Sequence, residues 1–323
     1  MNNIKGVALI TAMLIVALAS ILATQMLARM QYQLQRTTNI TFNQQAYWYA
    51  LGAEAFAQRL LVETFEDEEK VTHLGQDWAQ GENTFPVDFG EITGEISDLQ
   101  ACLNLNALRA ETEQNEKNQA AEALKELIVV LNIEGIGEFE AQYMVDALTD
   151  WLDEDTSIVS AGGAEDSDYG AKELPYLPAN SYLASVGELR VIEHFTVPVI
   201  TAIKPFVCVL PQSSAHKINI NTISDERPEL LQALLGISSS EASDLLSERK
   251  EEGYERVEDF FTSQAFAKLK VSEQQKQQFV VDSEYFTLKA KASFNNSYFA
   301  LKTVFEVSKN NQITVVSRTV GRD

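Results

Sequence analysis

The strongest chemical signal in the sequence is a short acidic stretch in the middle of the chain, between Asp150 and Asp168. It consists of two groups of carboxylates on either side of a Gly162-Gly163 turn. Carboxylate oxygens with no cysteine or histidine among them form the hard ligand set that Ca²⁺ prefers. Like charges this dense repel one another unless a cation holds them. The stretch therefore predicts a calcium site, to which a solvated acidic loop is the alternative. The candidate ligands are Asp150, Asp153, Asp155, Glu165, Asp166 and Asp168.

The sequence lacks the motifs of the common enzyme classes. It contains no Gly-x-Ser-x-Gly elbow, no His-Glu-x-x-His pair and no Gly-x-x-x-x-Gly-Lys loop. Its three histidines, His73, His194 and His216, are isolated from one another. We therefore expect a protein that is not an enzyme.

The charge of the chain argues against nucleic acid as a ligand. The 47 acidic and 25 basic residues give a formal net charge of -22, which repels phosphate backbones. Gly135-Ile-Gly137 fits the turn with which helix-hairpin-helix units hold a phosphate, but Glu138 and Glu140 follow it. We interpret this turn as a packing feature, and DNA binding as the rival function.

The first stretch of the chain can cross a membrane. Residues 7–28 carry no charge, and at ~1.5 Å rise per residue they span roughly the ~30 Å hydrocarbon core. Helical periodicity continues beyond them, which predicts one unbroken helix from about Val7 to about Phe65. Lys5 and the amino terminus precede the apolar run, whereas the acidic bulk follows it, so the N-terminus is expected in the cytoplasm.

Beyond this helix the sequence predicts an α+β fold. Alternating apolar residues over 85–108 indicate two or three short strands, and helical spacing follows over 120–131 and 139–152. Three more alternating stretches close the chain and predict an antiparallel meander with tight turns at Asn295-Asn296 and at 309–311. These last strands are Tyr285–Phe294, Tyr298–Val307 and Gln312–Val320. The helical middle, 109–281, is thus predicted to be inserted into the sheet.

The middle of the chain contains an internal repeat. Leu103-Asn-Leu-Asn-Ala-Leu108 matches Ile218-Asn-Ile-Asn-Thr-Ile223, and a helix, a glycine turn and a second helix are expected after each. We expect two units, about 109–197 and 218–281, which resemble helix-hairpin-helix and related SAM-like domains. The segment Pro198 to Pro211 is predicted to be a strand and connector.

The N-terminal residues carry a resemblance to a known family. Lys5-Gly6 before Val7 at the head of a long helix resembles the prepilin peptidase signal of type IV pilins and pseudopilins, in which the chain is cut after the glycine. The fifth residue after the cut is usually Glu in that class, and here it is Thr11. Together with the large acidic body, this resembles the minor pseudopilin K family of type II secretion systems. An ordinary single-pass anchor with a chance glycine is the alternative.

The resemblance implies a location, partners and a metal. It implies a single-pass protein of the bacterial inner membrane with its bulk in the periplasm, and a tip cap of the pseudopilus that helps to initiate assembly. The implied partners are the minor pseudopilins I and J, with minor pseudopilin H, the major pseudopilin and the prepilin peptidase as further candidates. It also implies Ca²⁺ at the acidic stretch. The expected divisions are a cleaved leader over 1–6, a transmembrane segment over 7–29, a helix and first strands over 30–108, the insertion over 109–281 and the closing strands over 282–323.

Two cysteines, Cys102 and Cys208, lie in apolar stretches of the expected periplasmic body. An oxidising compartment allows them to form a disulfide. Two separate buried thiols are the alternative.

Overall fold

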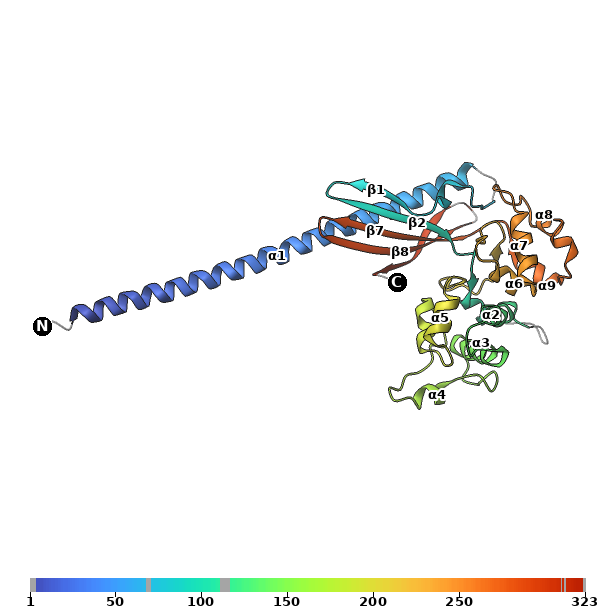
Figure 1. The fold of residues 1–323 in the computed structure, drawn as a ribbon, viewed down its shortest axis with the longest axis horizontal. Coiled ribbons are helices and arrows are strands. Elements are labelled where there is room, and N and C mark those ends of the chain that lie inside the picture. Colours follow the sequence, from blue (N-terminus) through green and yellow to red (C-terminus); the bar gives the residue numbers. More distant parts are fainter. Residues whose placement is uncertain (1–3, 68–70, 111–116, 309, 311, 322–323) are drawn as a thin grey trace.

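The structure, a computed structural model, describes residues 4–67, 71–110, 117–308, 310 and 312–321. It begins with α1 (Ile4–Asp67), a single helix of 64 residues. The first part of α1 extends away from the rest of the molecule (Figure 1), and its apolar window has a mean hydropathy of 2.5 and no buried residues. By length and composition this part can cross a membrane. The predicted long helix is confirmed.

The second half of α1 packs against an antiparallel sheet of five strands with the order β1-β2-β7-β8-β9. Its strands are β1 (Asn83–Val87), β2 (Gly90–Asp98), β7 (Tyr285–Phe294), β8 (Ser297–Val307) and β9 (Ile313–Val320). Ala50, Ala57 and Leu61 of the helix and Phe286 and Phe305 of the sheet are buried in this core. A short 3₁₀ helix, η1 (Asp77–Ala79), adds Trp78 to it. The fold class and the closing meander are as the sequence predicts.

An ion pair between a buried glutamate and an exposed arginine joins α1 to β8 and β9. Glu54, 7% exposed, accepts hydrogen bonds from Arg318 on β9 at 2.7 and 2.8 Å and from the Thr303 hydroxyl on β8 at 2.6 Å. Burial raises the pKa of Glu54, but these hydrogen bonds and the Arg318 charge outweigh it, so the net shift is downward. These contacts join the middle of α1 to two neighbouring strands of the sheet.

The helical middle of the chain is inserted between two hydrogen-bonded strands. β2 pairs with β7, and Asp98 is the register partner of Phe286. The inserted elements gather at the end of the sheet that is opposite the N-terminus (Figure 1). They are β3 (Leu103–Asn104), η2 (Leu105–Arg109), α2 (Gln119–Val130), α3 (Glu138–Leu152), α4 (Asp166–Gly170), η3 (Val186–Val191), α5 (Val197–Ile203), β4 (Val207–Cys208), β5 (Ile218–Asn219), α6 (Glu229–Leu235), α7 (Ser239–Ser247), α8 (Val257–Phe261), η4 (Phe266–Lys268), α9 (Glu273–Lys276) and β6 (Phe279–Val280).

The two Asn-containing repeats form the same local structure. The Asn104 side chain accepts a hydrogen bond from the Asn106 amide at 3.2 Å, and the Asn219 side chain accepts one from the Asn221 amide at 2.9 Å. Each first Asn thus turns the chain out of a two-residue strand, because its side chain competes with a strand ladder for the backbone. β3 pairs with β4, and β5 with β6, both in parallel.

Two expectations from the sequence are wrong in detail. The alternation that ends at Leu108 indicated a strand, whereas only Leu103–Asn104 is extended, and η2 follows it. The segment from Pro198 to Pro211 was expected to be a strand and connector, but α5 occupies its first part, with Pro198 in the first turn, where a missing N–H costs nothing. Only Val207–Cys208 is a strand there.

A disulfide closes the base of the insertion, and a buried carboxylate joins the insertion to the sheet. Cys102 and Cys208 are disulfide-bonded, with Cα atoms 5.8 Å apart. Asp98, 6% exposed at the end of β2, accepts hydrogen bonds from the Gln100 amide at 2.7 Å, the Thr222 hydroxyl at 2.5 Å and the Ser283 hydroxyl at 2.6 Å. Burial raises the pKa of Asp98 to about 6 even though these hydrogen bonds lower it.

Candidate metal centre

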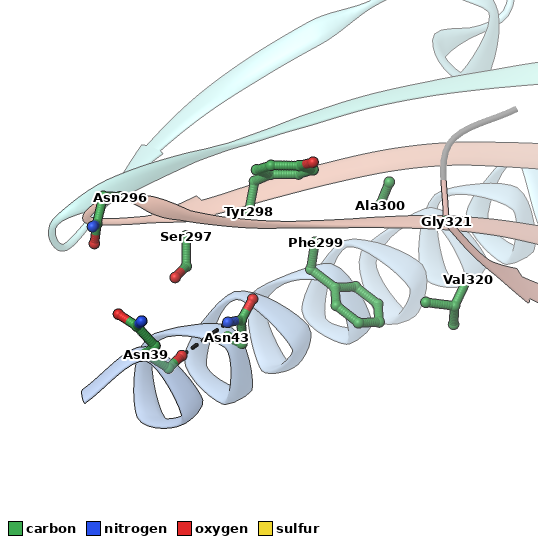
Figure 2. Close-up of a pocket in the computed structure, with 9 residues that line it drawn as sticks. All are labelled: Asn39, Asn43, Asn296, Ser297, Tyr298, Phe299, Ala300, Val320 and Gly321. Carbon is green, nitrogen blue, oxygen red and sulfur yellow. Dashed lines mark hydrogen bonds between the residues drawn. The ribbon is translucent and has the colours of Figure 1, made fainter. Parts of the chain in front are cut away.

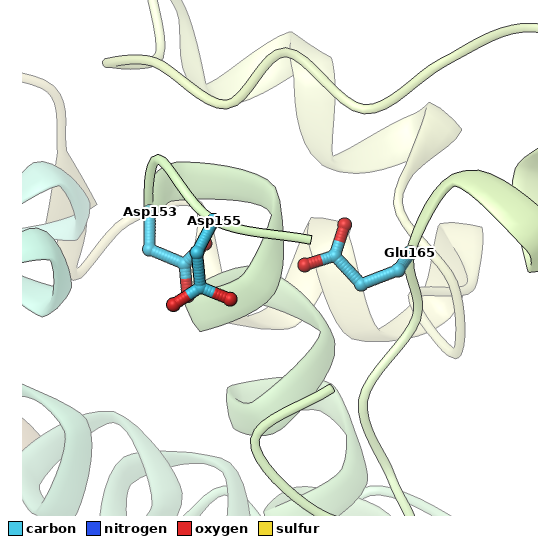
Figure 3. A group of neighbouring side chains, drawn as sticks. All are labelled: Asp153, Asp155 and Glu165. Carbon is cyan, nitrogen blue, oxygen red and sulfur yellow. The ribbon is translucent and has the colours of Figure 1, made fainter. Parts of the chain in front are cut away.

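Two segments of the insertion bring carboxylates together. Asp150 lies in the last turn of α3, Asp153 caps that helix and Asp155 follows it, whereas Glu165 precedes α4. Figure 3 shows Glu165 pointing across the loop towards Asp153 and Asp155. Each of these three residues offers a carboxylate oxygen, and the three oxygens lie within 4.8 Å of one another.

Several of these oxygens are buried without a hydrogen-bond partner. Among the described residues no donor reaches Asp150 Oδ2, Asp153 Oδ1 or either carboxylate oxygen of Glu165. The Asp150 side chain is fully buried, and Glu165 is 3% exposed. Buried charged groups that are unpaired are costly, and they are normally neutralised or bound to a metal. The donor set therefore fits a cation.

The electrostatics of the site point in the same direction. Burial raises the pKa of Glu165 to about 7, and the charges of Asp150 and Asp153 add to that shift. Burial likewise raises the pKa of Asp150 to about 6, against the hydrogen bond from the Val159 amide at 3.0 Å. The pKa of Asp153 is raised by burial and then by the Asp155 charge. A divalent cation among these groups would favour their ionised forms.

The glycine turn allows the loop to close over Asp150. A β-carbon on residue 163 would lie 2.1 Å from Asp150 Oδ2, so only glycine fits beside this carboxylate. The Gly163 amide donates to the Ser160 carbonyl at 3.0 Å, which tightens the turn. The turn therefore brings Glu165 back towards the end of α3.

Three of the six candidate ligands lie outside this group: Asp150, which is buried beside it, and Asp166 and Asp168, which are exposed. Asp168 is exposed and accepts a hydrogen bond from the Glu165 amide at 3.1 Å, so it caps α4 and positions Glu165. Asp166 is exposed in the first turn of α4.

Sequence reasoning missed Asn180. Its side-chain carbonyl oxygen is buried without a partner, and its amide nitrogen donates to the Asp155 backbone carbonyl at 3.2 Å. This places a neutral oxygen donor beside the acidic cluster. Its backbone has φ +44°, in the left-handed region, and the one available signal was an asparagine in a proline-containing connector.

An arginine closes the end of α3 next to the carboxylates. Arg109 donates to the Leu152 carbonyl at 2.6 Å and forms an ion pair with Glu154. Its guanidinium stacks over Tyr182, 4.7 Å from the ring centroid. The arginine thus satisfies helix-end acceptors and leaves the unpartnered oxygens of Asp153 and Glu165 to another cation.

The donor set selects the metal class. Carboxylate and amide oxygens suit Ca²⁺, which takes six to eight oxygen ligands, whereas zinc sites use nitrogen or sulfur. Asp153, Asp155 and Glu165 would hold the ion, and Asp150 and Asn180 are the nearby oxygen donors. Such an ion would fasten the end of α3 to the start of α4.

The glycine turn before α3 already uses one of the amides that a bound phosphate would need. The Gly137 amide, which would face a bound phosphate, donates to the Glu140 carboxylate at 2.9 Å. The Glu140 carboxylate, from the same helix, therefore caps the amide to which a phosphate oxygen would otherwise bind.

Comparison with known proteins gives a consistent set of relatives. Two family models, both described as Type II secretion system (T2SS), protein K, match residues 101–212 and 218–282. Type II secretion system protein K of Aeromonas hydrophila is 35% identical over 98% of this chain and 97% of its own length, and that of Klebsiella pneumoniae is 36% identical over 82% and 81%. A crystal structure of the GspK-GspI-GspJ complex from enterotoxigenic Escherichia coli contains a chain with a TM-score of 0.81 and 32% identity, covering 89% of this chain and 100% of that one.

Proposed function

This chain belongs to the type II secretion system protein K family, and we propose that it is the minor pseudopilin that caps the tip of the pseudopilus and helps to initiate its assembly. The observation that carries the proposal is the position of the insertion. It lies at the end of the sheet opposite the N-terminal part of α1 (Figure 1), where it would obstruct a further subunit. A subunit of this shape suits the last position of a filament that grows from the membrane.

The partners follow from the relative of known structure. That GspK chain was crystallised with GspI and GspJ, and we propose the corresponding I and J minor pseudopilins as the tip partners of this chain. Minor pseudopilin H and the major pseudopilin are proposed as neighbours further down. The proposed location is the inner membrane, with α1 crossing it once and the acidic body in the periplasm.

The residue at the fifth position after the expected cut supports a terminal position. The Thr11 hydroxyl donates to the Val7 carbonyl at 3.1 Å and to the Ala8 carbonyl at 3.0 Å, so it is satisfied within its own helix. A glutamate there would carry a charge into hydrocarbon and need a partner. A subunit with Thr11 requires no such pairing.

We also propose that the acidic centre binds Ca²⁺ and that the ion stabilises the first half of the insertion. The support is the set of buried, unpartnered oxygens on Asp150, Asp153 and Glu165. In this proposal the metal is structural, because it would join the two ends of the loop that follows α3.

Co-purification tests the proposed position in the filament. The full-length chain, co-expressed with its cognate I and J pseudopilins and extracted in detergent, should elute with both in a stable complex. In cells with assembled pseudopili, gold-labelled antibody against the insertion should mark one end of each filament. Labelling along the shaft in stoichiometric amounts would contradict a tip cap.

A further inference from the structure

A pocket of about 480 Å³ lies between α1 and the first residues of β8 (Figure 2). β8 pairs with β7 from Ser297 onwards, but β9 pairs with β8 only from Leu301. The first four residues of β8 therefore extend past the end of β9 and leave a gap beside the helix, which we call the β8 edge pocket. Its volume lies within the ~300–1,000 Å³ that is usual for small-molecule sites.

No charged side chain lines the β8 edge pocket, although the net charge of the chain is -22. The part of α1 beside it also has no charged residue between Arg36 and Glu54. A phosphate or carboxylate ligand would require basic side chains, and a metal ion would require carboxylates. The pocket is therefore suited to a neutral ligand.

Three asparagines and a serine supply the polar groups of the pocket. Figure 2 shows Asn39 and Asn43 of α1 facing Ser297 of β8. The Asn43 amide nitrogen donates to the Asn39 backbone carbonyl at 2.9 Å. In the described part of the chain, the side-chain amides of Asn39 and Asn296 and the Ser297 hydroxyl have no hydrogen-bond partner. An asparagine side chain has two donors and one acceptor, so these groups can bind hydroxyl or amide groups of a ligand.

Phe299 supplies an apolar wall. Its side chain points from β8 into the pocket, towards α1 (Figure 2). Tyr47 of α1 holds the ring in place, because the two rings pack edge-on with centroids 5.1 Å apart. The face of an aromatic ring carries partial negative charge, which attracts polarised C–H groups. A sugar ring presents such C–H groups on one face and hydroxyl groups around its rim, so it matches both the aromatic wall and the polar side chains.

Two other kinds of neutral ligand fit the pocket less well. A lipid chain would leave the amides and the hydroxyl without partners, which is unfavourable once water is displaced. A peptide strand that extended the sheet would need unused backbone groups along β8. The Gly321 amide already donates to the Ala300 carbonyl at 3.2 Å, so part of that edge is occupied.

We propose that the β8 edge pocket binds a neutral saccharide that carries N-acetyl groups. Phe299 packs against the C–H face of one sugar ring, and Asn39, Asn296 and Ser297 bind its hydroxyl and acetamido groups. An acetamido group has one N–H donor and one carbonyl acceptor, which pair with an asparagine side chain. The glycan strands of the bacterial cell wall have this chemistry. The inference rests only on the proposed periplasmic location of the body, and not on the proposed position in the filament.

Saccharide binding can be measured on the full-length chain alone, in a detergent without a sugar head group. A disaccharide of N-acetylglucosamine should give saturation-transfer NMR signals at millimolar concentration, and cellobiose, which lacks the acetamido groups, should bind more weakly. Asn39→Ala and Ser297→Ala should each weaken binding by about 3- to 10-fold, the effect of losing one neutral hydrogen bond. Both variants should keep the melting temperature of the wild type, because neither side chain is hydrogen-bonded within the described protein. Gln44→Ala, at an exposed residue of α1 outside the pocket, is the matched control and should bind normally.

The source of the saccharide is tested with purified cell-wall sacculi. Retention of the wild-type chain on sacculi, reduced in the Asn39→Ala/Ser297→Ala double variant, would support the site and identify the glycan strands as its ligand. Binding of the disaccharide without retention would support the site and identify a free saccharide instead. Absence of signals from the disaccharide, equal binding of cellobiose, or equal binding by the double variant would overturn the inference and leave the proposed function standing.

Discussion

Gly163 packs directly against the carboxylate of Asp150, which occupies the space that a β-carbon on residue 163 would need. The Gly163→Ala variant would place its β-carbon 2.1 Å from Asp150 Oδ2, so the turn or the carboxylate must shift. We expect this substitution to weaken calcium binding at least tenfold and to lower stability in calcium by about 1–3 kcal/mol, the usual cost of overpacking. Calcium titration by calorimetry measures the first effect. Gly170→Ala, at an open position in α4, should leave calcium binding unchanged and should not lower stability, because alanine favours the helix.

Neutralising Glu165 should have effects of opposite sign with and without calcium. In the presence of a chelator, Glu165→Gln removes a buried carboxylate with two unpartnered oxygens and should raise the melting temperature. In saturating calcium the same variant has lost a ligand and should melt below the wild type. The melting temperature of the Asp166→Asn variant, changed at an exposed residue, should differ little from that of the wild type in either condition. A Glu165→Gln variant with the same calcium affinity as the wild type would show that the cluster is a solvated acidic surface.

Removal of the metal should loosen the segment that follows the site. Chelation should lower the melting temperature of the full-length chain in detergent and make residues 169–178 accessible to protease, because the loop between α3 and α4 would lose its cross-link. Added calcium should reverse both changes, whereas equal magnesium should not, since Mg²⁺ requires a compact octahedral shell and retains its water. Limited proteolysis with mass mapping of the cleavage sites measures the effect.

Asp98 should make stability depend on pH between about 4 and 6. Its pKa is about 6 in the folded protein because of burial, and an unfolded Asp titrates near ~3.9. Between these values the native state holds a proton that the unfolded state has released, so the free energy of unfolding falls as pH rises. In chelator Asp150 and Glu165, whose pKa values are also raised, contribute a slope of the same sign. Asp98→Asn should therefore remove only the Asp98 part of the slope, and should gain up to about 3 kcal/mol relative to the wild type on going from pH 4 to pH 7. Melting curves in chelator across this range test it, with the exposed Asp88→Asn as the control that should follow the wild type.

The mature chain should begin at Val7. Mass spectrometry of the membrane-extracted protein should give the mass of residues 7–323 in cells with an active prepilin peptidase. Gly6→Val should retain the leader, because peptidases of this class need a small residue at the cut. An intact Met1 on the wild-type protein in such cells would contradict the processing prediction.

The parts of the fold with strong local signals were predictable from the sequence. α1 has an uninterrupted helical pattern, and β7 and β8 alternate cleanly around Asn295-Asn296, so both the elements and their order followed. The stretch ending at Leu108 was not predictable in the same way. A two-residue strand followed by a 3₁₀ turn has the same alternation of apolar and polar residues as one longer strand. The hydrogen bond that the Asn104 side chain accepts from the Asn106 amide decides between the two structures.

The candidate metal centre was predictable in composition and not in detail. The density of carboxylates identified the stretch, but it did not show that Glu165 is buried in the cluster while the neighbouring Asp166 is exposed. It also did not show that Asp168 caps α4 and lies outside the group of three. Both differences depend on how α4 packs against the rest of the insertion. Asn180 is separated from the acidic stretch by a connector, and only the hydrogen bond to the Asp155 carbonyl brings it there.

The pairing of Asp98 with Phe286 has a consequence for how the chain folds. The sheet cannot form this pairing until the chain between the two residues brings its own ends together, and closing so long a disordered loop is entropically unfavourable. If the insertion folds first, its β5–β6 pair and the Cys102–Cys208 disulfide hold the chain after Asp98 close to the chain before Phe286. The entropy lost on closing this loop is then compensated by the folding of the insertion, before β2 pairs with β7. In that order of events β2, although it precedes the insertion in the chain, pairs with β7 only after the insertion has folded. Folding of the insertion would then limit the rate at which the sheet assembles.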